Sequence, residues 1–188
     1  MYDHYQGLIF DMDGTLLDTE PTHVRAWQQV LSKYGMQYDY DVMKSYNGTP
    51  TWKIAKIIID MHNQDLDPLA LAREKAEVVE SFLFDEVKAL KLIDVVKHYY
   101  GSKPMAVGTG SPNQLADRLL THLGLRRYFD AIVGSEDVKN HKPAPDTFLL
   151  CAKLLHVAPE KCVVFEDADF GIQAAIAANM SYVDVRKS

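Results

Sequence analysis

Phe10-Asp11-Met12-Asp13-Gly14-Thr15 closes a short apolar run that begins at Gly7. A continuous apolar run of this length predicts a strand that is buried on both faces. Asp11 and Asp13 are two residues apart, so an extended backbone points both carboxylates to the same side. At the carboxyl end of a parallel strand, such a pair can hold a hard cation, and one member can attack phosphorus or transfer a proton. A plain turn after the strand is the alternative, because Asp and Gly are common in turns.

Apolar runs of the same kind recur later in the chain and alternate with helical patterns. Strands that alternate with helices predict βαβ units and a parallel sheet. We therefore expect an α/β fold with a Rossmann-like parallel-sheet core. The later apolar runs cover residues 105–108, 131–134, 162–165 and 182–185, and the helical patterns between them cover residues 113–123, 146–155 and 170–178.

The chain between the run that begins at Gly7 and the run at residues 105–108 has helical patterns throughout. Residues 23–34 have helical spacing of apolar side chains. Thr49-Pro50 and Asp67-Pro68 predict the starts of two further helices, because they combine an N-cap residue with a first-turn proline. We expect a small helical cap inserted after the first strand, with residues 16–87 as the cap and residues 1–15 and 88–188 as the core.

Composition and charge exclude several classes of protein. The 188 residues are 47% hydrophobic and 24% charged, which is typical of a globular domain and excludes a disordered chain. With 20 basic and 26 acidic residues, the net charge is −6, and no basic run is present to bind nucleic acid. No apolar stretch reaches membrane-spanning length, and the N-terminus lacks a signal-peptide pattern. Cys151 and Cys162 stand in apolar segments, so we expect reduced, buried thiols in a soluble cytoplasmic protein.

Two stretches that follow predicted strands carry groups suited to binding anions. Gly108-Thr109-Gly110-Ser111 joins a strand to a helix, where backbone amides and a hydroxyl can bind phosphate; a plain turn is the alternative. Lys142 precedes Pro143, which favours an extended backbone and can fix the lysine as a counter-charge for phosphate. A free surface lysine is the alternative there, and we expect His141 to be a solvated loop residue.

A second acidic stretch, Glu166-Asp167-Ala168-Asp169, follows the predicted strand at residues 162–165. Neighbouring carboxylates repel one another, and a bound cation relieves that repulsion. Acidic residues that complement the start of the next helix are the alternative. Because the carboxyl ends of parallel strands meet at one edge of a sheet, we expect one site with metal-binding acids, a phosphate cradle and a fixed cation.

The four stretches together resemble the motifs of the haloacid dehalogenase-like hydrolase superfamily, in order and spacing, and the resemblance runs the whole length of the chain. Asp18-Thr19-Glu20, followed by His23 and Trp27, is similar to the β-phosphoglucomutase-like branch. Within that branch the chain looks most like small bacterial sugar phosphatases that act on fructose 1-phosphate and 6-phosphogluconate. The four motifs are matched by Asp11-Met12-Asp13-Gly14-Thr15, Thr109, Lys142-Pro143 and Glu166-Asp167.

The resemblance implies a role for each of these residues. Asp11 would be the nucleophile that forms an aspartyl-phosphate, and Asp13 would protonate the leaving oxygen and later deprotonate water. The phosphoryl group would be held by Thr109, the following residues Gly110 and Ser111, and Lys142. A Mg²⁺ ion would be bound by Asp11, Asp167 and the backbone carbonyl of Asp13, with Glu166 close by; whether Glu166 or Asp169 touches the metal stays open.

Departures from the branch pattern bear on the reaction and the substrate. Thr51 stands where branch members that handle bisphosphates have a cap arginine, which favours hydrolysis over a phosphomutase reaction. His23, Asn47 and Lys75 match positions that reach substrate in relatives, with solvated helix residues as the alternative. We therefore expect a magnesium-dependent phosphatase of small sugar phosphates that is a monomer or weak dimer. A phosphomutase, a receiver domain and a non-catalytic sensor are the rival interpretations.

Overall fold

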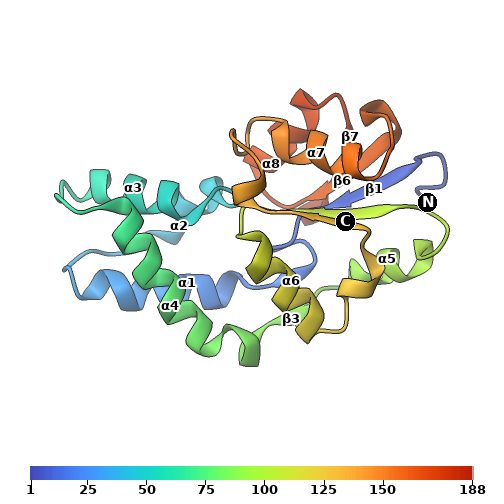
Figure 1. Ribbon diagram of the computed structural model, residues 1–188. Helices are drawn as coiled ribbons and strands as arrows, with labels where there is room; N and C mark the ends of the chain where they lie inside the picture. The colour runs from blue at the N-terminus through green and yellow to red at the C-terminus, as the bar shows by residue number, and fades with distance from the viewer. Residues whose placement is uncertain (188) are drawn as a thin grey trace.

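A computed structural model describes residues 1–187, and a five-stranded parallel sheet lies at its centre (Figure 1). The strand order is β5-β4-β1-β6-β7, so the predicted Rossmann-like parallel-sheet core is confirmed. Every residue of β1, β4 and β6 is buried, as the apolar runs predicted. The strands are β1 (Gly7–Phe10), β4 (Met105–Gly108), β5 (Ala131–Val133), β6 (Cys162–Glu166) and β7 (Ser181–Asp184).

Helices cover both faces of this sheet, and alternate residues of each strand contact opposite faces. Leu8 and Phe10 of β1 pack with α5 (Ile93–Tyr99) and α6 (Asn113–His122) on one face. Ile9 packs with α7 (Asp146–Leu154) and α8 (Asp169–Ala177) on the other. Figure 1 shows α7 and α8 above the sheet and α5 and α6 below it. Among the described residues, Cys151 of α7 and Cys162 of β6 are both free and buried between the sheet and the α7–α8 layer, as predicted.

The segment between β1 and β4 forms a group of helices with its own apolar cluster, which extends to the left in Figure 1. Trp27 and Leu31 of α1 pack against Ile58 of α3 and Leu71 of α4 in this cluster. The side chain of Asp67 caps α4 by accepting a hydrogen bond from the Leu69 N–H, as predicted. These helices are α1 (Glu20–Ser32), α2 (Tyr40–Met43), α3 (Thr51–Met61) and α4 (Pro68–Glu86).

Two details of this segment were wrongly predicted. An antiparallel pair, β2 (Leu17–Asp18) and β3 (Lys88–Ala89), joins its two ends, and β2 lies within residues 16–87, where only helix was expected. Two-residue strands are too short to show an alternating pattern, so the sequence carried no signal for them. Thr49 does not cap α3: its hydroxyl donates instead to the Tyr46 carbonyl, and Pro50 occupies the N-cap position.

Short 3₁₀ helices fill several of the connections. None of the helices within residues 1–187 is both long and apolar enough to cross a membrane. The 3₁₀ helices are η1 (Lys44–Tyr46), η2 (Arg126–Tyr128), η3 (Ser135–Asp137), η4 (Pro159–Lys161) and η5 (Val185–Lys187).

Candidate active site

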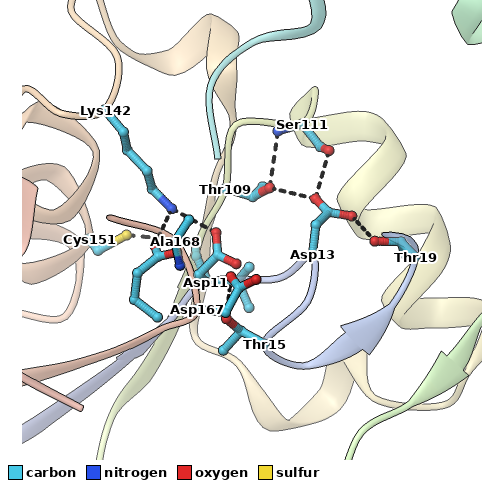
Figure 2. Close-up of polar contacts among 12 residues, drawn as sticks. Asp11, Asp13, Thr15, Thr19, Thr109, Ser111, Lys142, Cys151, Asp167 and Ala168 are labelled. Carbon is cyan, nitrogen blue, oxygen red and sulfur yellow. Dashed lines mark hydrogen bonds and ion pairs between the residues drawn. The ribbon is translucent and has the colours of Figure 1, made fainter. Parts of the chain in front are cut away.

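The site lies at the carboxyl end of β1, in the middle of the sheet. The chain reaches β4 on one side of β1 and β6 on the other, so β1 marks the point where the strand order reverses. Open α/β sheets bind their ligands at such a point. Asp11 and Asp13 follow β1, Thr109 follows β4, and Asp167 follows β6, so the parallel topology brings the predicted residues together (Figure 2).

Lys142 forms two buried ion pairs at the bottom of the site. Its Nζ lies 2.6 Å from Asp11 Oδ1 and 2.7 Å from Glu166 Oε2, and all three side chains are at most 2% exposed. Burial alone would lower the pKa of the lysine, but the two carboxylates raise it above its ordinary value. Lys142 is therefore a fixed ammonium group and not a free surface lysine.

Asp11 is unusual because it is a buried carboxylate beside another one. Burial, and then the charge of Glu166, raise the pKa of Asp11 to about 7, although Lys142 opposes the shift. Burial and the nearby Asp11 likewise raise the pKa of Asp167 to about 7. A partly protonated carboxylate pair of this kind becomes fully ionised when a cation binds between its members.

The residues present fit a divalent cation. Oxygen atoms of Asp11, Glu166 and Asp167 lie within 4.8 Å of one another, and hard cations prefer such carboxylate ligands. Both Glu166 oxygens already have partners, Lys142 on Oε2 and the Ala168 N–H on Oε1, which leaves Asp11 and Asp167 as the better ligands. Asp169 is not in this cluster and pairs with Arg186 instead.

Gly14 leaves room for the Asp167 carboxylate beside the loop. Its φ is +82°, and a Cβ at this position would lie 2.3 Å from Asp167 Oδ2. A side chain at residue 14 would therefore push Asp167 away, and the cradle beside this carboxylate depends on glycine. The Thr15 hydroxyl donates to the other oxygen of this carboxylate, Asp167 Oδ1, over 3.2 Å and helps to fix it.

Asp13 points away from the acidic cluster, as Figure 2 shows. Its Oδ2 accepts hydrogen bonds from Thr109 at 3.2 Å and Ser111 at 2.9 Å, and its Oδ1 accepts one from Thr19 at 2.7 Å. Burial disfavours the charged form, but the nearby His23 ring, and then the hydrogen bonds from Thr19 and Ser111, hold the pKa of Asp13 well below its ordinary value. Asp13 is therefore an ionised carboxylate in this state.

The loop after β4 lies against the helical segment. Thr109 donates its backbone N–H to Val133 and accepts the Ser111 N–H on its hydroxyl, so the turn is tightly defined. A Cβ on Gly110 would lie 2.4 Å from the backbone oxygen of Gly48. The predicted phosphate-binding loop is thus next to Asp13 and in backbone contact with the helical segment.

The helical segment contributes His23 and Lys75 to the site. His23 Nε2 lies 3.6 Å from Asp13 Oδ1, and Lys75 Nζ contacts His23 Nδ1. Lys75 is only 4% exposed and lies 5.7 Å from the centre of the Trp27 ring. Burial lowers the pKa of Lys75 to about 8, and burial and then Lys75 lower the pKa of His23. His23 therefore lies beside Asp13 and Lys75 beside His23, and neither is a solvated helix residue.

A cavity of about 80 Å³ lies between the helical segment and the loops of the sheet. Asn47, the third predicted residue of the helical segment, lines this cavity and donates to Glu20. Glu20 and Tyr40 also line it, although sequence reasoning gave them no role. Glu20 precedes His23 by one helical turn, and that spacing on one helix face was the signal that could have found it.

The chain is similar over its whole length to phosphatases and to a phosphomutase. The family described as haloacid dehalogenase-like hydrolase matches residues 8–185. Fructose-1-phosphate phosphatase YqaB of Escherichia coli K12 is 64% identical over 186 residues, or 99% of each chain. A phosphorylated carbohydrates phosphatase of Thermotoga maritima is 33% identical over 95% of this chain and 83% of its own length. The crystal structure of a β-phosphoglucomutase from Clostridium difficile has a TM-score of 0.87 and 30% identity, and covers 98% of this chain and 88% of its own.

These similarities confirm the resemblance to the β-phosphoglucomutase-like branch and exclude a non-catalytic receiver or sensor. Hydrolases of this family use a divalent metal ion, which agrees with the acidic cluster of Asp11, Glu166 and Asp167. The chain therefore belongs to the haloacid dehalogenase-like hydrolase family, in which it is an enzyme that hydrolyses phosphoric monoesters.

Proposed function

We propose that this enzyme is a magnesium-dependent phosphatase of small sugar monophosphates, of the fructose 1-phosphate or 6-phosphogluconate type, that works through an aspartyl-phosphate. The observation that carries the proposal is the buried pair of Asp11 and Lys142, 2.6 Å apart, with Asp13 held beside it by Thr109 and Ser111. Phosphoryl transfer needs a positioned nucleophile and charge neutralisation, and this arrangement supplies both. The E. coli relative is a fructose-1-phosphate phosphatase, which supports the substrate class.

Each side chain then has a chemical task. Asp11 attacks phosphorus, while Lys142 and the loop at Thr109, Gly110 and Ser111 hold the phosphoryl oxygens. Asp167 and Asp11, with the Asp13 carbonyl, would hold Mg²⁺, and the bound ion would neutralise charge between the nucleophile and the phosphoryl group.

Asp13 has to act first as an acid and then as a base. Its depressed pKa leaves it ionised in the free enzyme, which suits the second step, removal of a proton from water. A phosphate ester bound next to Asp13 adds negative charge, and a nearby negative charge raises a carboxyl pKa. Substrate binding thus favours the protonated form that the first step needs.

We further propose that residues 16–87 move as a cap over a core formed by residues 1–15 and 88–188. Trp27 and Lys75 line the cavity from the helical side, and Asp13 and Ser111 line it from the sheet side. A substrate enclosed between them has to enter through a relative movement of the two parts, and such closure also excludes water. One chain supplies every group invoked, which is consistent with a monomer or weak dimer. The similarity to a sugar phosphatase of E. coli supports a cytoplasmic location.

A phosphomutase is the rival function, favoured by the similarity to the Clostridium difficile enzyme. A mutase has to bind a second phosphate, and Thr51, which lines the cavity, offers no charge for it. Release of inorganic phosphate, followed colorimetrically over a panel of sugar monophosphates with Mg²⁺, tests the proposal. Steady release that needs no bisphosphate and is abolished in Asp11→Asn supports a phosphatase, whereas conversion without phosphate release would overturn it.

A further inference from the structure

Glu20 occupies a position in the cavity that the mechanism does not use. Glu20, His23 and Trp27 follow one another along one face of α1, and all three line the cavity. His23 contacts Asp13, where the leaving oxygen is protonated, so Glu20 lies on the same wall one turn nearer the start of the helix. A leaving group that extends from Asp13 along this wall meets the Glu20 carboxylate.

Two side chains hold the Glu20 carboxylate in a single orientation. The Tyr40 hydroxyl donates to Oε1 over 2.8 Å, and Asn47 Nδ2 donates to the same oxygen over 3.1 Å. Within residues 1–187, both hydrogen bonds to this carboxylate end on Oε1, so Oε2 is left to accept from a ligand. The hydrogen bond to Glu20 also raises the pKa of Tyr40 to about 12, so the phenol remains a donor.

The same three side chains lie at a boundary of the cavity. Together with Gly14 and Asp167, they also line a second cavity of about 490 Å³, which Lys44 and Arg186 line as well. The hydrogen-bonded group of Glu20, Tyr40 and Asn47 therefore separates the two cavities, and Lys75 and Trp27 line only the first. An ionised carboxylate only accepts hydrogen bonds, so the group at this wall is complementary to a hydroxyl and not to an alkyl chain.

We propose that Glu20 is a specificity-determining residue that accepts a hydrogen bond from a hydroxyl of the leaving sugar, and that Tyr40 and Asn47 orient it. The inference rests on the proposed phosphatase function and names the feature of the substrate that the enzyme requires. A site built to bind a hydroxyl rejects analogues without one, because the polar group of the site is then left without its partner.

The test compares kcat/KM for fructose 1-phosphate with that for propyl phosphate, a monoester without hydroxyl groups. Glu20→Ala is expected to lower kcat/KM for fructose 1-phosphate about 10- to 100-fold, mainly through KM, and to change that for propyl phosphate less than about twofold. Glu20→Gln keeps a neutral acceptor, so its loss is smaller. Tyr40→Phe keeps the ring but frees the carboxylate, and we expect a loss of about three- to tenfold, again only for the sugar ester.

Glu74→Ala is the matched control. Glu74 accepts a hydrogen bond from the Tyr34 hydroxyl over 2.7 Å on the exposed surface, outside the cavity, and its loss should change neither kcat/KM. An equal loss for both substrates in Glu20→Ala and Tyr40→Phe would overturn the role of Glu20, and so would no loss at all. If wild-type enzyme releases no phosphate from any sugar monophosphate, the proposed function itself fails, and the role of Glu20 fails with it.

Discussion

Gly110 and Gly48 approach so closely that a β carbon on Gly110 would lie 2.4 Å from the Gly48 oxygen. The loop after β4, which we propose binds phosphate, and the helical segment thus meet backbone to backbone. The φ of Gly110 is outside the left-handed region, so alanine is allowed there once the two parts separate. Gly110→Ala should keep its Tm within about 2 °C of wild type while kcat/KM falls about 10- to 100-fold, because a misplaced cap misaligns the reacting groups. Calorimetry and steady-state kinetics measure the two quantities, and unchanged kinetics would show that closure does not need this contact.

Lys142→Ala should impair both activity and stability. The variant leaves Asp11 and Glu166 buried without their counter-charge, which costs about 3–5 kcal/mol in the free energy of unfolding. It also removes a donor to the phosphoryl group, so kcat should fall about 10²- to 10³-fold. Urea denaturation and phosphate release report these effects. The neighbouring variant His141→Ala should be nearly silent in both assays, because His141 is a partly exposed loop residue that does not line the cavity; an equal effect of both variants would contradict the role assigned to Lys142.

Magnesium affinity should fall as the pH falls. The pKa values of Asp11 and Asp167 are both about 7, and a proton competes with the metal at each carboxylate. We expect the apparent Kd for Mg²⁺ to be about 10- to 100-fold weaker at pH 6 than at pH 8, measured as the Mg²⁺-dependent rise in Tm. Asp167→Asn should abolish that rise. Asp169→Asn should retain it, because Asp169 pairs with Arg186 outside the cluster; its loss in this variant would add Asp169 to the metal site.

Lys75 should destabilise the fold at neutral pH. Its pKa is about 8 in the folded state against 10.5 ordinarily, so between these values the unfolded chain holds a proton that the folded chain has lost. The contribution of Lys75 to stability therefore rises with pH across this window and is least favourable below it. Lys75→Met should raise the free energy of unfolding by about 1–3 kcal/mol at pH 7 and by much less near pH 10.5, while lowering activity.

Urea denaturation at the two pH values checks this prediction. Lys56→Met serves as the control, because Lys56 is exposed and pairs with Asp60 one turn away, and such pairs contribute about 0.5 kcal/mol or less. A Lys75→Met variant that is less stable than wild type at pH 7 would show that the contact with His23 outweighs the burial of the charge.

The sheet and the central part of the site could be predicted because both follow from short-range patterns. The apolar run that ends at Phe10 predicts a buried strand, and a parallel sheet then brings Asp11, Thr109 and Asp167 to one edge whatever the details of packing. Lys142 could be included because Pro143 restricts its backbone.

The spacing on one face of α1 points to Glu20, but the rest of the cavity wall could not be predicted, because it depends on how the helices pack. Glu20 and Tyr40 are 20 residues apart and meet only when α1 and α2 are in place. The burial of Lys75 also depends on packing, since a lysine in an amphipathic helix is ordinarily exposed. The pairing of β2 with β3 joins residues about 70 positions apart through two-residue strands, which have no periodicity to detect.

Cys151 of α7 and Cys162 of β6, buried between the sheet and the α7–α8 layer, have a practical consequence for studying the fold. Burial raises the pKa of both thiols, and an alkylating reagent reacts only with an exposed thiolate. Iodoacetamide labelling of unmodified protein should therefore follow the opening of this layer, and substrate analogues that bind the native state should slow it. The labelling rate of the two native thiols thus reports how often this part of the structure opens, without an added probe.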